Sequence, residues 1–581
     1  MNSKFIALLC LVLMVAFTGL YAQAPDTVEV PFQDESGPVG AINRFIQGDT
    51  LANGDRVNPN RTYKLINGSY YLFNSAITCN YSISVWADPT GTPPILCRGI
   101  LEDNSAAANQ FTITKTGAMG TFKNLYFMGI RPDLFALGNG PNAVQLRADS
   151  VKVVIDNCVL DAMGGMANEN TNWSSAKITN CHTRNAVEIG CWFCGNSGFY
   201  SNATPNDTIV ITNNTFFNWG SYGLVTNREW TNYVRVEHNT YYLNHCNVFY
   251  APYVTHGVYK NNIFFGMTAM GQRPVEISGG WFDWDGEVSA IFSIDTLPPE
   301  IFARQGETVM DMTVSFNHNA YFWPQQMVDF WANSPYDSAG MEPVKPEEQT
   351  LTPPMWVNNR TQGFIDNVPG VTEYDNLNVD PQFNDASVVA QVDSMVKYTL
   401  QQRNFTITTY RHYYFGEGQG WTGENYSAAN LFPPLWPIPE KMTYDNSELM
   451  TASDMGLPLG DLNWYPESKA YWEAHVSGIK APEGVAKVPG KYSLAQNYPN
   501  PFNPETTIKF QITKPENVKL TVFNTLGQKV ITLIDQKQEA GEHAVTWNGV
   551  NQIGQRVASG IYYYRLESGD FTMTKKMMLL K

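Results

Sequence analysis

A short pattern recurs through the middle of the chain and constrains its fold more than any other feature. An apolar run, a turn residue and a second apolar or aromatic run follow one another in FKNLYF, IDNCVL, ITNCHT, ITNNTF, VEHNTY, YKNNIF and FNHNAY. The shortest spacing between copies is 23 residues, from 157 to 180 and again from 238 to 261, and longer spacings indicate insertions. A repeat of this length is typical of a solenoid of stacked coils. The turn residues are Asn124, Asn157, Asn180, Asn213, His238, Asn261 and His318.

The residue types favour strands over helices in each coil. The copies are rich in Val, Ile, Thr, Tyr and Phe, and Asn and Gly separate them, whereas helical repeats need a 3.6-residue period. The LxxLxL signature of leucine-rich repeats is absent. A coil of about 23 residues has room for three short strands and three turns. We therefore predict an all-β chain built on a right-handed parallel β-helix.

Asn at the turn has a physical reason. Its backbone tolerates the left-handed conformation that a tight turn needs, and its amide can bond to the same amide one coil away, about 4.8 Å along the stack. We expect His238 and His318 to be members of this ladder rather than catalytic residues or metal ligands.

These features resemble those of secreted proteins with a pectate-lyase-like parallel β-helix. The segment 67–96, NGSYYLFNSAITCNYSISVWADPTGTPPIL, is similar to the first coils of that family, and NVDPQFND at 378–385 is similar to a segment that often closes the helix. The resemblance covers about residues 60 to 390. It implies the fold and a polysaccharide as the partner class.

The outward side chains of one strand per coil predict where a site lies. The segments AVQLR, AVEIG, YGLVT, NVFYA and PVEIS occupy corresponding places, so Gln145, Glu188, Phe249 and Glu276 are expected to point outward. The loops that follow are rich in aromatic residues, whose flat faces stack on sugar rings. The predicted stacking residues are Trp192, Trp230, Tyr253, Trp281 and Trp284. The alternative is that these rings cover small cores within their own loops.

Charged side chains on the same face are the predicted catalytic residues. The carboxylates can act as acid and base, and Arg228 can act as a base or bind a substrate carboxylate. Asp283 and Asp285 are candidate ligands of a calcium ion, and no other cofactor is expected. The polygalacturonase signatures are absent, so the sequence leaves open whether the chain is a polysaccharide lyase, a glycoside hydrolase or no enzyme. The predicted catalytic residues are Glu188, Arg228, Glu229, Glu276, Asp283 and Asp285.

The N-terminus and the overall charge indicate where the chain acts. Residues 1–22 have a lysine, an apolar run and a small-residue cleavage site, as signal peptides do. The net charge of -16 argues against a nucleic-acid partner, and we expect a monomer.

Seven cysteines follow residue 22, and the pair in Cys191-Trp-Phe-Cys194 is expected to be a local disulfide or two buried thiols rather than a zinc site.

The composition divides the rest of the chain. The β-helix is expected over residues 23–394. Residues 395–476 are rich in Pro and aromatic residues and are expected to form an irregular cap on the solenoid, with a short helix at 466–476. Residues 477–491 are expected to form a linker. Six alternating segments within 492–581 predict a small immunoglobulin-like β-sandwich.

The last segment carries a second resemblance. NYPNPFNPETTIKF, VFNTLGQKV, AGEHAVTWNG, SGIYYYRL and KKMMLLK are similar, in their order, to the C-terminal sorting domain of proteins exported by the type IX secretion system. This resemblance implies contact of 492–581 with that machinery and delivery through the periplasm to the cell surface or the medium. The chain is thus predicted to be an exported, polysaccharide-directed protein, the rival being a non-catalytic adhesin or envelope component.

Overall fold

The computed structural model shows two compact units, one formed by Met1–Thr296 and Thr313–Tyr471 and the other by Leu297–Met312 and Trp472–Lys581. The structure describes residues 26–580 except 33–38, 52–55, 104, 106, 130–141, 162, 170, 185–198, 203, 220–223, 228–230, 245–248, 251–252, 270, 273–276, 278–285, 296–297, 300–301, 303–306, 334–350, 394, 397–435, 477–492, 495–496, 498–499, 501, 513–515, 526, 539–540 and 570.

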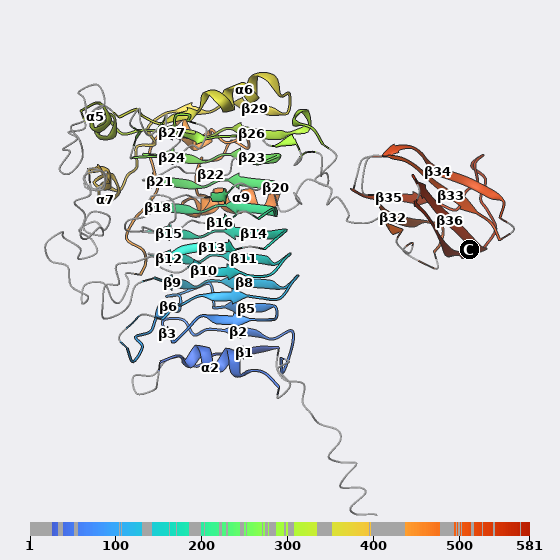
Figure 1. Cartoon of the computed structure of the whole chain (residues 1–581), viewed down its shortest axis with the longest axis horizontal. Coiled ribbons are helices and arrows are strands. Elements are labelled where there is room, and N and C mark those ends of the chain that lie inside the picture. Colours follow the sequence, from blue (N-terminus) through green and yellow to red (C-terminus); the bar gives the residue numbers. More distant parts are fainter. Residues whose placement is uncertain are drawn as a thin grey trace, which may run out of the picture. The chain divides into compact units, whose positions relative to one another are not determined.

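The first unit contains the predicted right-handed parallel β-helix. Its strands form three parallel sheets, and from β2 to β22 the chain visits sheet 1, sheet 2 and sheet 3 in turn. Figure 1 shows the coils stacked in chain order from α2 to α6.

Sheet 1 has eleven strands: β1 (Thr27–Glu29), β2 (Thr62–Lys64), β5 (Ile83–Trp86), β8 (Met119–Lys123), β11 (Lys152–Asp156), β14 (Ser174–Thr179), β17 (Asn206–Thr212), β20 (Thr231–Glu237), β23 (His256–Lys260), β26 (Thr313–Asn317) and β29 (Val371–Tyr374). Sheet 2 has ten: β3 (Tyr70–Phe73), β6 (Ile95–Arg98), β9 (Tyr126–Met128), β12 (Val159–Asp161), β15 (His182–Arg184), β18 (Thr215–Trp219), β21 (Thr240–Asn244), β24 (Ile263–Phe265), β27 (Ala320–Phe322) and β30 (Leu377–Asn378). Sheet 3 has seven: β4 (Ile77–Cys79), β7 (Phe111–Ile113), β10 (Asn142–Leu146), β13 (Gly164–Glu169), β16 (Phe199–Asn202), β19 (Leu224–Asn227) and β22 (Phe249–Tyr250).

The turn from sheet 1 to sheet 2 has the backbone that the sequence predicted. All seven turn residues are left-handed, with φ between 51° at His318 and 60° at Asn261. The predicted bond between turn-residue amides is present from Asn157 Nδ2 to Asn124 Oδ1 at 2.8 Å. The continuous amide ladder of the later coils, however, is formed by the residue that follows each turn residue. Each ladder amide donates to the next amide oxygen at 2.9–3.0 Å, through Asn214, Asn239, Asn262, Asn319 and Asn376.

Cysteine takes the ladder position in two earlier coils. Cys181 donates its backbone N–H to Asn214 Oδ1 at 2.8 Å, and its Sγ lies 3.1 Å from the carbonyl of Thr179. Burial raises the pKa of the Cys181 thiol well above its usual value, so the thiol stays protonated and can donate. The cysteines that the structure describes, Cys79, Cys97, Cys158 and Cys181, are all buried free thiols.

Aromatic side chains fill the interior of the coils. Phe216, Tyr241 and Phe264 stack with centroids 4.6 and 5.1 Å apart. Phe249 contacts Tyr241 and stacks on Phe292 at 5.4 Å, and it is 4% exposed. The expectation that Phe249 points outward was therefore wrong, because a shift of one residue moves a strand side chain to the opposite face.

Short helices lie near the two ends of the solenoid. Near its start, α2 (Ala41–Gly48) buries Ile42 and Ile46, and Asn43 donates to the carbonyl of Ser75 at 2.8 Å. Near the other end, Figure 1 shows α6 (Asn359–Asn367) beside β29. Other elements of this region are α5 (Gln325–Asn333), α7 (Ala386–Val389) and the strand pair β25 (Ala290–Phe292) with β28 (Met355–Val357), whereas η1 (Val309–Asp311) belongs to the second unit.

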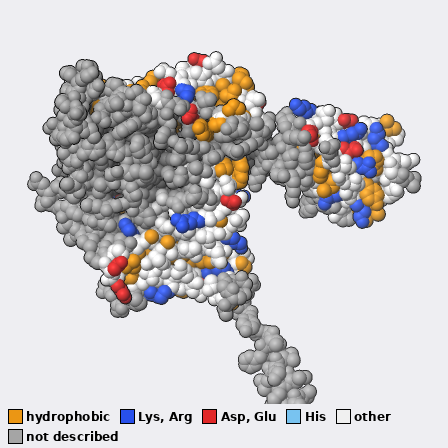
Figure 2. All heavy atoms as spheres, viewed as in Figure 1, with side chains coloured by type: hydrophobic (Ala, Val, Ile, Leu, Met, Phe, Trp, Pro, Cys, Tyr) orange, Lys and Arg blue, Asp and Glu red, His pale blue; other side chains and the backbone are white. Residues whose placement is uncertain are grey.

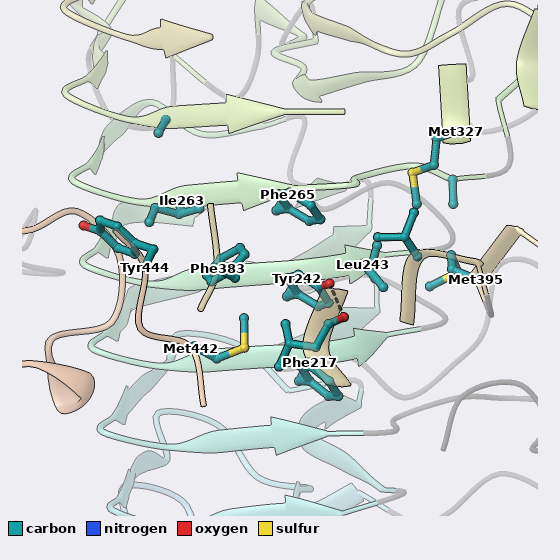
Figure 3. Close-up of a cluster of buried hydrophobic side chains, with 14 of the residues drawn as sticks. Phe217, Tyr242, Leu243, Ile263, Phe265, Met327, Phe383, Met395, Met442 and Tyr444 are labelled. Atoms are coloured by element: carbon teal, nitrogen blue, oxygen red, sulfur yellow. Dashed lines mark hydrogen bonds between the residues drawn. The ribbon is translucent and has the colours of Figure 1, made fainter. Parts of the chain in front are cut away.

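Residues 436–465, here named the strap, pack along the outer face of sheet 2. Phe217, Tyr242 and Phe265 stack on that face at 5.3 and 4.9 Å, and Figure 3 shows Phe383 and Met442 against them. The hydroxyl of Tyr242 also donates to the carbonyl of Val388. The strap includes η6 (Leu449–Thr451) and η7 (Leu462–Trp464), and the predicted helix follows as α9 (Pro466–Val476). Within the described residues, the segment expected as a cap thus contacts middle coils through their side.

The second unit contains the predicted immunoglobulin-like sandwich. One sheet is β31 (Ser493–Leu494), β32 (Thr506–Ile512) and β35 (Gly541–Trp547), and the other is β34 (Lys529–Gln538), β33 (Glu516–Phe523), β36 (Gly560–Ser568) and β37 (Phe571–Leu579). The core between them includes Ile508, Leu520, Trp547 and Tyr564. Figure 2 shows hydrophobic and basic side chains side by side on the visible face of this unit.

No helix in the described part of the chain is both long and apolar enough to cross a membrane.

Candidate functional site

Most of the site predicted from the sequence lies outside the described residues. This holds for Glu188, Trp192, Arg228, Glu229, Trp230, Glu276, Trp281, Asp283, Trp284 and Asp285. Tyr253 is described: it is half-buried, in the turn between β22 and β23, and its carbonyl accepts the backbone N–H of Thr231 at 3.0 Å. Its role as a stacking residue stays a prediction.

The row of sheet 3 to which Glu188 was assigned has a different member in that coil. Gln145 pairs in register with Ala167, Ala167 with Tyr200, and Tyr200 with Val225. The described strand of sheet 3 that follows β15 is therefore β16, and the segment AVEIG at 186–190 lies outside the described residues. Gln145 itself accepts from Gln110 Nε2 at 3.0 Å.

Metal binding was proposed only at Asp283 and Asp285, which are not described. Among the residues that are, no group of three or more His, Cys, Asp or Glu side chains is placed to hold a metal ion.

A buried ionic cluster, here named cluster 1, joins sheet 2 to the strap. Arg184 Nε and Nη2 contact the two oxygens of Glu440 at 2.6 and 3.0 Å, and Arg184 Nη1 contacts Asp161 Oδ2 at 3.0 Å. His182 Nε2 lies 2.8 Å from the same carboxylate, and the Tyr126 hydroxyl donates to Asp161 at 2.7 Å. Strand register places Arg184 beside Asp161, because β12 pairs with β15.

The electrostatics of cluster 1 favour ions over neutral groups. Burial opposes ionisation of Glu440, but Arg184 and His182 outweigh it and hold the pKa of that carboxyl at about 2. Arg184 is only 3% exposed, as is Glu440, so each charge is shielded from water and is stabilised by its ion-pair partner instead. A two-pronged guanidinium–carboxylate contact fixes orientation as well as charge.

The chemistry of cluster 1 is that of an anchor. A carboxylate with a pKa near 2 is a poor general acid or base at neutral pH, and every oxygen of Glu440 already accepts from a protein donor. Next to it, Thr215 donates to Asp461 at 2.7 Å and accepts from Trp464 Nε1 at 2.8 Å. Sequence reasoning did not select these residues, although HTR within ITNCHTR places two basic side chains in a segment of the repeat that is otherwise mostly apolar or aromatic.

A second ionic group, here named cluster 2, fastens the strap on the other side of the turn. Lys260 contacts Asp454 of the strap and lies 3.4 Å from Glu237, which also pairs with Arg235. Asn261 Nδ2 donates to Asp454 at 2.8 Å. Glu237 is fully buried, and although burial opposes ionisation, Arg235 and Lys260 lower its pKa.

His238 lies inside cluster 2 as a neutral ring. Its Nδ1 lies 3.2 Å from the carbonyl of Gly460 and must carry the proton, while Nε2 is 3.3 Å from the amide of Asn261 and accepts from it. Burial lowers the pKa of His238 to about 4, with Glu237 and Asp454 opposing this shift and Lys260 adding to it.

Because of this ring, we expect the free energy of unfolding to decrease as the pH is lowered. The unfolded histidine takes up a proton below pH 6.5 but the folded one only near pH 4, so its contribution is complete above 6.5 and is lost as the pH falls towards 4. A difference of this size corresponds to about 3 kcal/mol. His238→Asn keeps a side chain suited to the left-handed backbone and should flatten the dependence of the urea midpoint on pH between 6.5 and 4. An unchanged slope would show that His238 titrates normally.

Comparison with known proteins supports the immunoglobulin-like fold of the second unit. The FlgD Ig-like domain family matches residues 498–570, in agreement with the sandwich. No curated protein matches the chain. Two solved structures from Porphyromonas gingivalis contain similar regions, each at 19% sequence identity. The match to dimeric latent PorU covers 16% of this chain and 9% of PorU, with a TM-score of 0.14. The match to PorZ, an essential surface component of the type IX secretion system, covers 18% of this chain and 13% of PorZ, with a TM-score of 0.12. The chain thus spans about a tenth of the length of either protein.

Proposed function

We propose that this chain is an exported protein of the cell surface or the medium, in which the C-terminal sandwich is a type IX secretion sorting domain. One observation carries the proposal: the segments that resemble sorting-domain motifs fall on strands of an immunoglobulin-like fold in the expected order. TTIKFQI is β32, GIYYYRLES is β36, and FTMTKKMML is β37. The turn between β33 and β34 has Gly527 at a φ of 77°, as its sequence NTLG requires.

Export tests this proposal in a bacterium that has the secretion system. Deletion of 492–581 should leave the β-helix in the periplasm, because the signal peptide still acts and the sorting domain is missing. The same ninety residues fused to a periplasmic reporter should bring the reporter to the surface or the medium. Surface delivery of the truncated chain would contradict the proposal.

For the β-helix we propose a polysaccharide as the target. Support comes from the pectate-lyase-like resemblance and from the parallel sheets, whose stacked coils offer repeating side-chain rows to a linear polymer. The predicted residues of the sheet 3 face, with Arg228 and Glu276 as the first to replace, are the proposed contacts. Release of reducing ends or unsaturated products from a polysaccharide, and its loss in Arg228→Ala and Glu276→Ala, would establish a lyase or hydrolase.

A non-catalytic adhesin or envelope protein is the second candidate. The observation that favours it is that clusters 1 and 2 use their acidic and basic side chains to hold the strap rather than to face a substrate. Binding to a polysaccharide without any product would favour this candidate. Product formation would exclude it.

A further inference from the structure

Trp173 is an exposed residue in a backbone conformation that disfavours large side chains. It lies where the chain passes from β13 to β14, has a φ of 62° and is 41% exposed. The equivalent turns of the two preceding coils have Ser150 and Gly117 at φ values of 59° and 71°. The same backbone bond recurs in all three, from Gly117 to Asp149, from Ser150 to Asn172 and from Trp173 to Pro205.

The backbone conformation disfavours a tryptophan here. The left-handed conformation strains a bulky side chain, whereas Gly adopts it freely and Asn nearly so. An indole that keeps this much exposed surface also gains less from burial than one in the core. Strained residues persist where the surrounding structure enforces them, and they cluster at binding sites.

The groups around Trp173 suit hydroxyl-bearing ligands. Asp149 Oδ1 accepts from the backbone N–H and the amide of Asn172 at 2.7 and 3.3 Å, which holds an exposed carboxylate against the residue that precedes Trp173. On the next coil Asp207 accepts from the hydroxyl of Ser175 at 3.1 Å. Carboxylate oxygens with free lone pairs accept from sugar hydroxyls, and an indole face packs on the C–H face of a sugar ring.

The turns below Trp173 leave room for a polymer. A Cβ added at Gly117 would meet no atom within 4 Å, and Ser150 lies between them as a small exposed residue. Successive coils rise by about 4.8 Å, so a chain lying across these turns would pass from the indole over Ser150 to Gly117.

We propose that Trp173 is a stacking platform for one sugar ring of a neutral polysaccharide, with Asp149 and Asn172 binding its hydroxyls. This inference rests on the proposed polysaccharide function and adds a subsite on the edge between sheets 3 and 1, outside the predicted loops.

The test uses the full mature chain and affinity electrophoresis through gels that hold neutral or acidic polysaccharides. Trp173→Gly and Trp173→Asn should weaken binding to the neutral polymer at least tenfold. Both should leave the unfolding temperature unchanged or raise it, because these residues fit the left-handed backbone. The matched control is Trp436→Ala, since Trp436 is also 41% exposed but lies in the strap rather than on these turns; it should bind as the wild type does.

The outcomes separate this inference from the function on which it rests. If the wild type binds none of the polysaccharides, the polysaccharide function fails and the subsite fails with it. If the wild type binds and the Trp173 variants bind equally well, only the subsite is overturned. Lower unfolding temperatures in both variants would show that Trp173 is a structural residue, and preference of the wild type for acidic polymers through Trp173 would overturn the ligand class.

Discussion

Replacing Glu440 with alanine is expected to destabilise the first unit by about 3–5 kcal/mol, because it leaves the buried guanidinium of Arg184 with one carboxylate instead of two. The strap should also become a substrate for proteases, since Glu440 is its contact with Arg184 and His182. Urea unfolding followed by tryptophan fluorescence measures the first effect, and limited proteolysis near residues 436–465 measures the second. Glu440→Gln, which keeps an acceptor, should lose less than Glu440→Ala.

The control for this experiment is an exposed ion pair in the same unit. Lys64 and Asp88 are 2.8 Å apart, but the Asp88 side chain is 53% exposed, so Asp88→Ala should change stability by at most about 1 kcal/mol. Equal effects of Glu440→Ala and Asp88→Ala would show that cluster 1 does not anchor the strap.

Acid should weaken the same contact. Glu440 titrates near 4.5 when unfolded and at about 2 when folded, so its contribution is present above pH 4.5 and is lost as the pH falls towards 2. The pH range in which Glu440 loses its contribution thus starts and ends about two units below that of His238, which begins at pH 6.5 and ends near pH 4.

The local part of the fold could be predicted from the sequence, because it depends on neighbouring residues. Turn positions follow from residues that tolerate a left-handed backbone, and the strands of the sandwich, such as β32 and β36, follow from alternation. The amide ladder was displaced by one residue for a related reason. In doublets such as Asn213-Asn214 both residues are Asn, and sequence alone does not tell which one bends the chain and which one stacks.

The long-range part could not be predicted. Arg184 and Glu440 are 256 positions apart, and no local pattern links a strand residue to the strap. The strand register of sheet 3 is set by pairing between coils that are separated by insertions of variable length, so Phe249 was placed on the wrong face. The candidate site is the part of the molecule that could least be predicted, because most of its residues were assigned to the loops between these coils.

The ladder itself predicts the second large effect. Asn239 is fully buried; its amide donates to the carbonyls of Ile211 and Glu237 and to Asn262, and its oxygen accepts from both nitrogens of Asn214. Asn239→Ala would leave several of these groups unpaired, each at a cost of about 1–3 kcal/mol, so a total loss of at least about 3 kcal/mol is expected in urea unfolding.

The preceding coil supplies the matched control for this change. Asn213 is the same residue type and is 1% exposed, but it supplies the left-handed turn at a φ of 53° and its side-chain oxygen has no hydrogen-bond partner. Asn213→Gly keeps that backbone conformation and should cost less than about 1 kcal/mol. If Asn213→Gly is as harmful as Asn239→Ala, the two roles are not divided between adjacent residues, and the turn and the ladder stabilise the β-helix as one unit.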